Sequence, residues 1–115
     1  MTYQELTEAI KNGRKSFTGE DLRNQSFYGL DLKDADFSGA DLRGSVFGET
    51  DLTWARFDGA DLRGALFDET GLQWAHFDGA DLRGACRYLC DFSSSTFDGA
   101  DLRGTKIGKK EAPGH

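Results

Sequence analysis

The chain has 115 residues, 37% of them hydrophobic and 30% charged, and a formal net charge of −6 at pH 7. This length suits a single domain and leaves no room for a separate catalytic lobe. The negative charge argues against direct nucleic-acid binding, which needs a basic surface. Since the chain has no apolar run of membrane-spanning length and no signal peptide at its start, we expect a cytoplasmic protein without a membrane partner.

Residues 1–14 are predicted to form an N-terminal helical cap. Thr2 and Glu5 have the spacing of a capping box, in which each side chain accepts a hydrogen bond from the backbone N–H of the other residue. Repeat proteins need such caps, because the first coil otherwise exposes an apolar end and unpaired strand edges. We therefore expect a structural role for this helix, and a helix that binds a partner is the alternative.

Residues 15–107 follow a period of five. Large apolar residues stand at nearly every fifth position, and a small residue such as Ala or Ser stands two positions before most of them. A helix would spread these positions around all its sides, because five residues advance about 140° beyond one full turn. In an extended segment residues two apart share a face, so the small and the large residue both point inward. The period therefore predicts short extended sides joined by corners.

The sequence also repeats every twenty residues. The segment Phe-Asp-Gly-Ala-Asp-Leu-Arg-Gly occurs unchanged at 57–64, 77–84 and 97–104. Four sides of five residues thus make one coil, and successive coils pair at the strand spacing of about 4.8 Å. Parallel crossover connections are strongly right-handed. We predict an all-β solenoid, a right-handed four-sided parallel β-helix of about 4.5 coils, with an N-terminal capping α-helix.

The unit Ala-Asp-Leu-Arg-Gly, found at 40–44, 60–64, 80–84 and 100–104, closely resembles the repeat of the pentapeptide-repeat proteins. Their signature is a small residue, Asp or Asn, Leu or Phe, a polar residue and then any residue. The resemblance extends over residues 15–107 and implies the same four-sided β-helix, but it does not by itself imply an activity. Some members of that family resemble duplex DNA closely enough to occupy topoisomerases and protect them from quinolones. Members also often pair through their C-terminal coil.

Charged columns are expected on the outer faces of the coil. The Asp-Leu-Arg segments put an Asp column beside an Arg column, whose opposite charges keep the coils in register, and a ligand-binding face is the alternative. Asp58, Asp78 and Asp98 form a second, acidic column. They are either solvated turn carboxylates that bond corner amides or part of a surface that mimics DNA. The solenoid is only about 24 Å long at strand spacing, which disfavours mimicry by a monomer.

Trp54 and Trp74 stand one coil apart at equivalent corner positions, where side chains point away from the core. Exposed Trp residues are enriched in the hot spots of protein interfaces. We therefore interpret the stacked pair as a candidate contact patch, and a packing ladder that stiffens the corner is the alternative.

The repeat is interrupted once, late in the chain. Arg87 occupies a position that holds Phe elsewhere, and burial of an unpaired guanidinium is costly, so we expect it to turn outward while Tyr88 or Leu89 fills the gap. Cys86 and Cys90 are too few for a disulfide framework, and Cys90 is predicted to fill a small-residue position in the core. A metal site would need more ligands than these two residues, so we expect no metal and no cofactor.

Residues 108–115 are predicted to form a polar tail that supplies no helical cap. The last coil, with Phe97, Leu102 and Ile107, would then present an apolar and unpaired edge, and such edges tend to be covered. A homodimer through this end is the assembly that we expect.

The residues do not indicate an enzyme, because the chain has two His residues and no phosphate-cradling loop or nucleophile–His–acid pattern. We predict a non-catalytic structural or scaffold module that binds a protein partner which the sequence does not identify. The alternative is an acidic DNA mimic that binds or protects a DNA topoisomerase such as gyrase.

Overall fold

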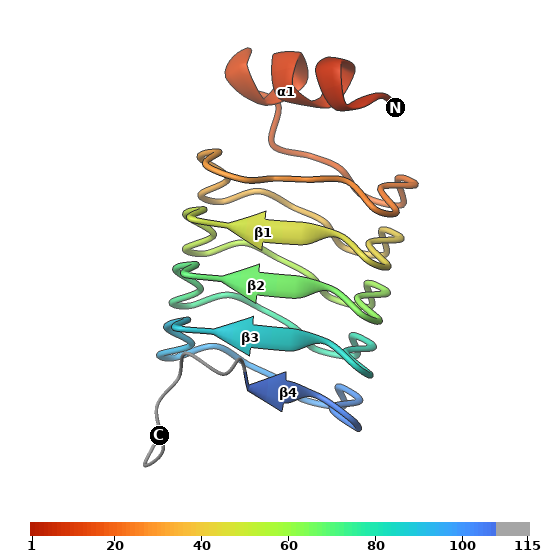
Figure 1. Ribbon diagram of the computed structural model, residues 1–115, viewed down its shortest axis with the longest axis vertical. Helices are drawn as coiled ribbons and strands as arrows, with labels where there is room; N and C mark the ends of the chain where they lie inside the picture. The colour runs from red at the N-terminus through yellow and green to blue at the C-terminus, as the bar shows by residue number, and fades with distance from the viewer. Residues whose placement is uncertain (108–115) are drawn as a thin grey trace.

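The computed structural model describes residues 1–107 of the chain. Within this range it contains one helix, α1 (Tyr3–Lys11), and four short strands, β1 (Val46–Gly48), β2 (Leu66–Asp68), β3 (Cys86–Tyr88) and β4 (Lys106–Ile107). Figure 1 shows α1 lying across one end of a stack of coils, with the four strands one above another along a single face.

The strands pair in parallel, and their register confirms the coil of twenty residues. Val46 pairs with Leu66, and the same offset relates β2 to β3 and β3 to β4. Parallel bridges on the other sides, such as that between Asp41 and Asp61, have this offset as well. The chain therefore has the predicted fold, a right-handed four-sided parallel β-helix with an N-terminal α-helix.

Tight turns form the corners between the sides. At the corner after Phe57, the Ala60 N–H donates to the Phe57 carbonyl oxygen at 3.0 Å, and Gly59 between them has a φ of +68°. Glycine suits this position because L side chains are strained at positive φ. Trp54 and Trp74 occupy the equivalent position in their own corners, with φ values of 64° and 61°. These two residues are therefore held in a backbone conformation that is unfavourable for a side chain.

Two columns of stacked Phe rings fill the core. Phe57 is fully buried and stacks on Phe37 and Phe77 of the adjacent coils, with ring centroids 5.3 and 4.9 Å apart. Phe47 and Phe67 of the second column meet it edge to face. The small residues beside the rings are buried as well, among them Ala35, Ala40, Ala55, Ala60, Ala65, Ala75 and Ala80. The expected inward pairing of one small and one large residue is thus confirmed.

The helix α1 covers the first coil. Its capping box is present, because the Glu5 N–H donates to Thr2 Oγ1 at 3.1 Å and the Thr2 N–H donates to Glu5 Oε1 at 2.9 Å. Leu6 is fully buried in the same core as Phe17, and Ile10 packs against that core. Phe17 belongs to the first coil and would face solvent without the helix, so α1 caps the apolar end.

Burial declines toward the C-terminal end of the stack. Phe97 is half-buried whereas Phe77 is fully buried, and Leu102 is 46% exposed. A cavity of about 410 Å³ lies at this end, lined among others by Phe97 and Leu102. The side chain of Ile107 and the predicted tail at 108–115 lie outside the described part of the chain.

At the interruption of the repeat, the orientation of Arg87 differs from the expectation. Arg87 keeps the register of Phe67, is half-buried, and lines the same cavity, with its guanidinium carbon 6.0 Å from the centre of the Phe92 ring. Tyr88 follows Arg87 in the strand and so lies on the opposite face, and Leu89 is 48% exposed. The prediction that Arg87 turns outward is therefore wrong. Pairing on both sides of β3 holds the backbone register, and the cavity accommodates the long side chain.

Cys90 takes the place that a threonine holds in the preceding coil. Thr70 Oγ1 donates to the carbonyl oxygen of Phe47 at 2.8 Å. One coil later, Cys90 Sγ donates to the carbonyl oxygen of Phe67 at 3.3 Å. Cys90 is half-buried and packs against the core. Cys90 therefore fills the small-residue position as predicted, and it also bonds a backbone carbonyl.

Candidate functional site

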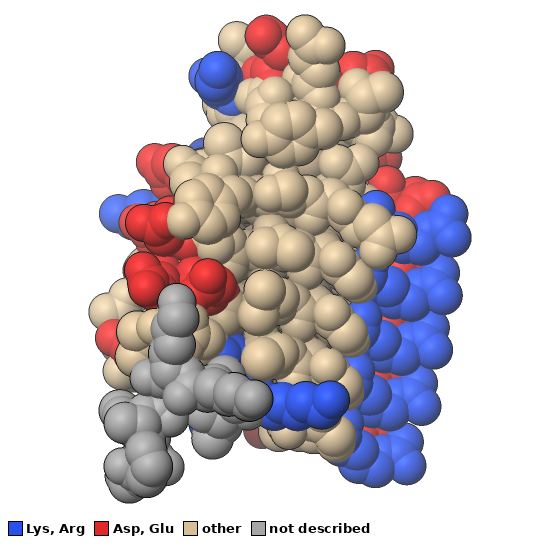
Figure 2. Space-filling view, in the orientation of Figure 1, with Lys and Arg blue, Asp and Glu red and all other residues tan. Residues whose placement is uncertain are grey.

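One outer face of the coil carries a ladder of paired Asp and Arg side chains, visible as the blue and red column at the right of Figure 2. Arg63 donates to Asp61 at 2.9 Å from Nε and at 2.6 Å from Nη2, and its Nε also lies 3.8 Å from Asp81 on the next coil. Pairs of this kind are Asp21–Arg23, Asp41–Arg43, Asp61–Arg63, Asp81–Arg83 and Asp101–Arg103. Bidentate pairs that also reach the neighbouring coil support the register-keeping role expected for this ladder.

The hydrogen bonds of the ladder keep its carboxylates ionised. Side-chain hydrogen bonds from Arg23 and Arg103 lower the pKa values of Asp21 and Asp101 to about 2. The pKa of Asp61 is lowered for the same reason, although its partial burial acts in the opposite direction. Each carboxylate therefore faces a guanidinium at neutral pH, and the ladder as a whole is electrically neutral.

The acidic column has a structural role of its own. The Asp78 N–H donates to Asp58 Oδ1 at 3.1 Å, and the Asp98 N–H donates to Asp78 Oδ1 at 2.9 Å. Asp58 also pairs with Arg56, whose Nη2 lies 3.0 Å from Asp58 Oδ2. Asp58 and Asp78 therefore each accept a hydrogen bond from a backbone amide of the next coil. This is the arrangement expected if the column stabilises the stack.

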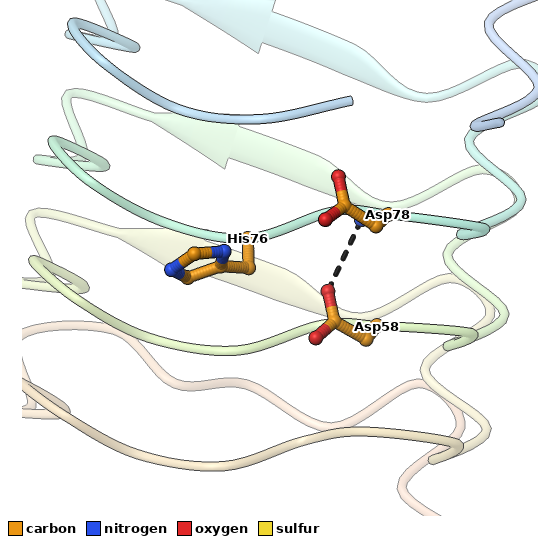
Figure 3. A group of neighbouring side chains, drawn as sticks. All are labelled: Asp58, His76 and Asp78. Carbon is orange, nitrogen blue, oxygen red and sulfur yellow. Dashed lines mark hydrogen bonds between the residues drawn. The ribbon is translucent and has the colours of Figure 1, made fainter. Parts of the chain in front are cut away.

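His76 joins the acidic column to form a cluster that the sequence analysis did not identify. One potential ligand atom each of Asp58, His76 and Asp78 lies within 4.8 Å of the other two. Figure 3 shows that His76 and Asp78 lie on one coil and Asp58 on the adjacent one. Two sequence features could have revealed this cluster: His76 and Asp78 are only two residues apart, and residues twenty apart stack.

The two Trp side chains form the predicted stack. Their ring centroids are 5.1 Å apart with an interplanar angle of 9°, and Trp54 and Trp74 are 47% and 49% exposed. The rings stand on one corner and Asp58 and Asp78 stand on the next corner along the chain, so the Trp pair and the acidic column occupy consecutive corners of the coil. The exposed Leu102 lies instead at the open end of the stack. The structure thus places the predicted site residues in separate regions.

Within residues 1–107, the structure contains no helix long and apolar enough to cross a lipid bilayer.

Comparison with solved structures identifies similar coils. HetL, a pentapeptide repeat protein involved in heterocyst differentiation regulation in the cyanobacterium Nostoc sp. strain PCC 7120, is 26% identical with a TM-score of 0.51. The match covers 90% of this chain and 48% of HetL, so the chain spans about half the length of that protein.

Two further structures share less geometry with this chain. A pentapeptide repeat protein from the Arabidopsis thaliana thylakoid lumen is 25% identical, over 84% of this chain and 68% of that protein, with a TM-score of 0.41. QnrB1, a plasmid-mediated fluoroquinolone resistance protein, is 20% identical, over 80% of this chain and 70% of that protein, with a TM-score of 0.36. At these TM-scores neither structure supports an argument about function. Among curated proteins, none matches the chain significantly.

The sequence model of pentapeptide repeats matches eight copies in this chain, at residues 16–44 and 45–84. The matched segments make up more than half of the chain, and they contain four of the five Asp-Arg pairs of the ladder. This chain therefore belongs to the pentapeptide-repeat family.

Proposed function

We propose that this protein is a non-catalytic module that binds another protein through Trp54 and Trp74. The observation that carries the proposal is that two stacked indole rings are each about half exposed, at 47% and 49%, in a strained backbone conformation. Rigid aromatic side chains offer a large contact area and lose little conformational entropy on binding.

The backbone beneath the Trp pair is well ordered by hydrogen bonds. The Trp54 N–H donates to the Gln73 carbonyl oxygen and the Trp74 N–H to the Ser93 carbonyl oxygen, both at 3.0 Å. Such bonds to the next coil hold both corners in place, so the patch needs no rearrangement before a partner binds. This pre-organisation favours binding because less freedom is lost on association.

Affinity capture from an extract of the native source tests the contact patch. Protein bound by the wild-type chain should be lost from the double variant Trp54→Ser/Trp74→Ser. Ser94 occupies the same corner position one coil later with a φ of 60°, so Ser is compatible with the fold there. Tyr3→Ser removes an aromatic side chain of similar exposure from α1 and should leave capture intact. Equal capture by wild type and the double variant would refute the patch.

The second candidate function, mimicry of DNA toward a topoisomerase, rests on the acidic column and on the net charge of −6. The neutral Asp-Arg ladder on another face weakens this candidate, since duplex DNA is negative on all sides. A gyrase supercoiling assay with and without a quinolone separates the two candidates. Inhibition or protection at micromolar protein, lost in Asp58→Asn/Asp78→Asn/Asp98→Asn, would favour mimicry, and the absence of any effect would dismiss it.

We further propose that two chains pair through their C-terminal coils. Leu102 is 46% exposed and Phe97 is only half-buried, and an apolar coil end of this kind is usually covered in repeat proteins. Light scattering at high concentration should give twice the mass of one chain, and Leu102→Glu should return it to the mass of one chain. A wild-type protein with the mass of one chain would contradict the dimer.

We also propose that the protein is located in the cytoplasm, as we expect from its sequence. Cell fractionation followed by immunoblotting of the native protein tests it, and recovery in a membrane or secreted fraction would contradict it.

A further inference from the structure

The three members of the cluster around His76 are arranged across two adjacent coils (Figure 3). His76 lies on an extended side, Asp78 lies two residues later in the turn that ends this side, and Asp58 has the position of Asp78 on the preceding coil. Their potential ligand atoms all lie within 4.8 Å of one another. Ligand atoms around a tetrahedral Zn²⁺ ion are about 3.3 Å apart at normal bond lengths, so binding requires side-chain rotations that draw this set together.

Hydrogen bonds orient all three side chains. Asp58 Oδ1 accepts the Asp78 N–H at 3.1 Å and Asp78 Oδ1 accepts the Asp98 N–H at 2.9 Å, so one oxygen of each carboxylate is held toward the next coil. His76 Nδ1 lies 3.3 Å from Thr96 Oγ1, which restrains the imidazole ring. Contacts of this kind typically fix the orientation of ligands in metal sites.

We propose that Asp58, His76 and Asp78 form a binding site for a divalent transition-metal ion such as Zn²⁺. One imidazole nitrogen and two carboxylate oxygens suit Zn²⁺, Ni²⁺ or Cu²⁺ better than Mg²⁺ or Ca²⁺, which favour oxygen ligands alone. Three protein ligands also leave a coordination position for water or for a side chain of another molecule. The bound ion offsets the repulsion between the two carboxylates and links two coils.

Arg56 competes with the ion for one ligand. It occupies the position of His76 on the preceding coil, and its Nη2 lies 3.0 Å from Asp58 Oδ2. A bound metal must replace this ion pair, so Arg56 lowers the affinity. Thr96 occupies the same column one coil after His76, which makes Thr a replacement compatible with the fold at position 56 and at position 76.

Isothermal titration calorimetry of the untagged protein with ZnCl₂, in a buffer that does not chelate metals, measures the site. His76→Thr and Asp78→Asn each remove one ligand, and each should weaken Zn²⁺ binding about tenfold or more. Asp98→Asn is the matched control, because it removes the same charge from the same column but no ligand, and it should change the affinity less than about twofold. Arg56→Thr should bind Zn²⁺ more tightly than the wild type.

Several results would overturn the proposal. One is the absence of Zn²⁺ binding by the wild type up to about 1 mM, a concentration at which even a weak site fills. Another is an equal loss of Zn²⁺ affinity in Asp78→Asn and Asp98→Asn, which would show that acidic side chains attract the ion in general and that no specific ligand set binds it. Because thiols and imidazoles elsewhere also bind Zn²⁺, the titration is repeated with Cys86→Ser, Cys90→Thr and His115→Ala combined. Loss of binding in that variant would assign the ion to those residues instead.

Discussion

Truncation of a single ring in the Phe columns tests how the core is held together. Phe57 is fully buried and contacts rings on both sides, Phe37 and Phe77 by stacking and Phe47 and Phe67 edge to face. Replacement of a buried Phe by Ala costs about 3–5 kcal/mol, because burial of the ring is lost and a cavity remains. Backbone hydrogen bonds hold the coils at a fixed spacing and prevent collapse into the cavity, so we expect about 4–5 kcal/mol for Phe57→Ala.

Phe97 provides a matched comparison at the open end of the stack. It has the same position in the repeat as Phe57 but stacks on one side only, against Phe77 at 5.0 Å, and it is half-buried. Phe97→Ala removes less buried area than Phe57→Ala and breaks one stacked ring pair where Phe57→Ala breaks two. We therefore expect the free energy of unfolding to fall by about 1–2 kcal/mol.

Equilibrium unfolding in urea, followed by circular dichroism, measures both losses as changes in the free energy of unfolding. Domains are typically stable by about 5–15 kcal/mol, so Phe57→Ala should remove a large share of the total and Phe97→Ala a small one. Equal losses at the two positions would refute the reasoning, since they would mean that the ring at the end is as well enclosed as the ring in the middle.

Three further predictions concern the outer ladder, the buried hydroxyls and the corners. The folded-state pKa values of Asp21 and Asp101 are about 2, below the ordinary 3.8, so their contribution to stability is complete above about pH 5 and is lost as the pH falls toward 2. The midpoint of thermal unfolding should fall over that pH range, and it should fall less steeply in Arg23→Gln/Arg103→Gln. The same pH dependence in the wild type and the double variant would show that these two ion pairs do not cause the loss of stability. Thr70→Val removes the buried hydroxyl whose single hydrogen lies between two carbonyl oxygens, 2.8 and 3.0 Å from Oγ1, and urea unfolding should show a loss of about 1–3 kcal/mol, against little change for the more exposed Thr53→Val. Gly59→Ala should cost about 1–2 kcal/mol because φ is +68°, although the added Cβ meets no atom within 4 Å; an unchanged urea midpoint would show that the corner tolerates the strain.

The amino-acid sequence by itself determined the architecture of this protein. The five-residue period decided which side chains face inward, and the twenty-residue repeat decided which residues stack on successive coils. Both patterns are sufficient because each coil contacts only its neighbours, so one local rule applied repeatedly specifies the whole stack. The capping box of Thr2 and Glu5 is likewise local, and the columns of Asp, Arg and Trp follow directly from the period.

Only the tertiary structure decided what happens where the pattern breaks and which atoms bond across coils. Arg87 keeps the register of the inward position because β3 pairs with both neighbouring strands, and its side chain lines the cavity at this end of the stack. The bond from the Asp78 N–H to Asp58, and the approach of His76 to both carboxylates, depend on side-chain rotamers and on the groups one coil away. Periodicity places whole columns of residues side by side, but it does not specify the directions in which their polar atoms point. The sequence therefore places Asp58, His76 and Asp78 near one another, and only the structure shows how close their potential ligand atoms come.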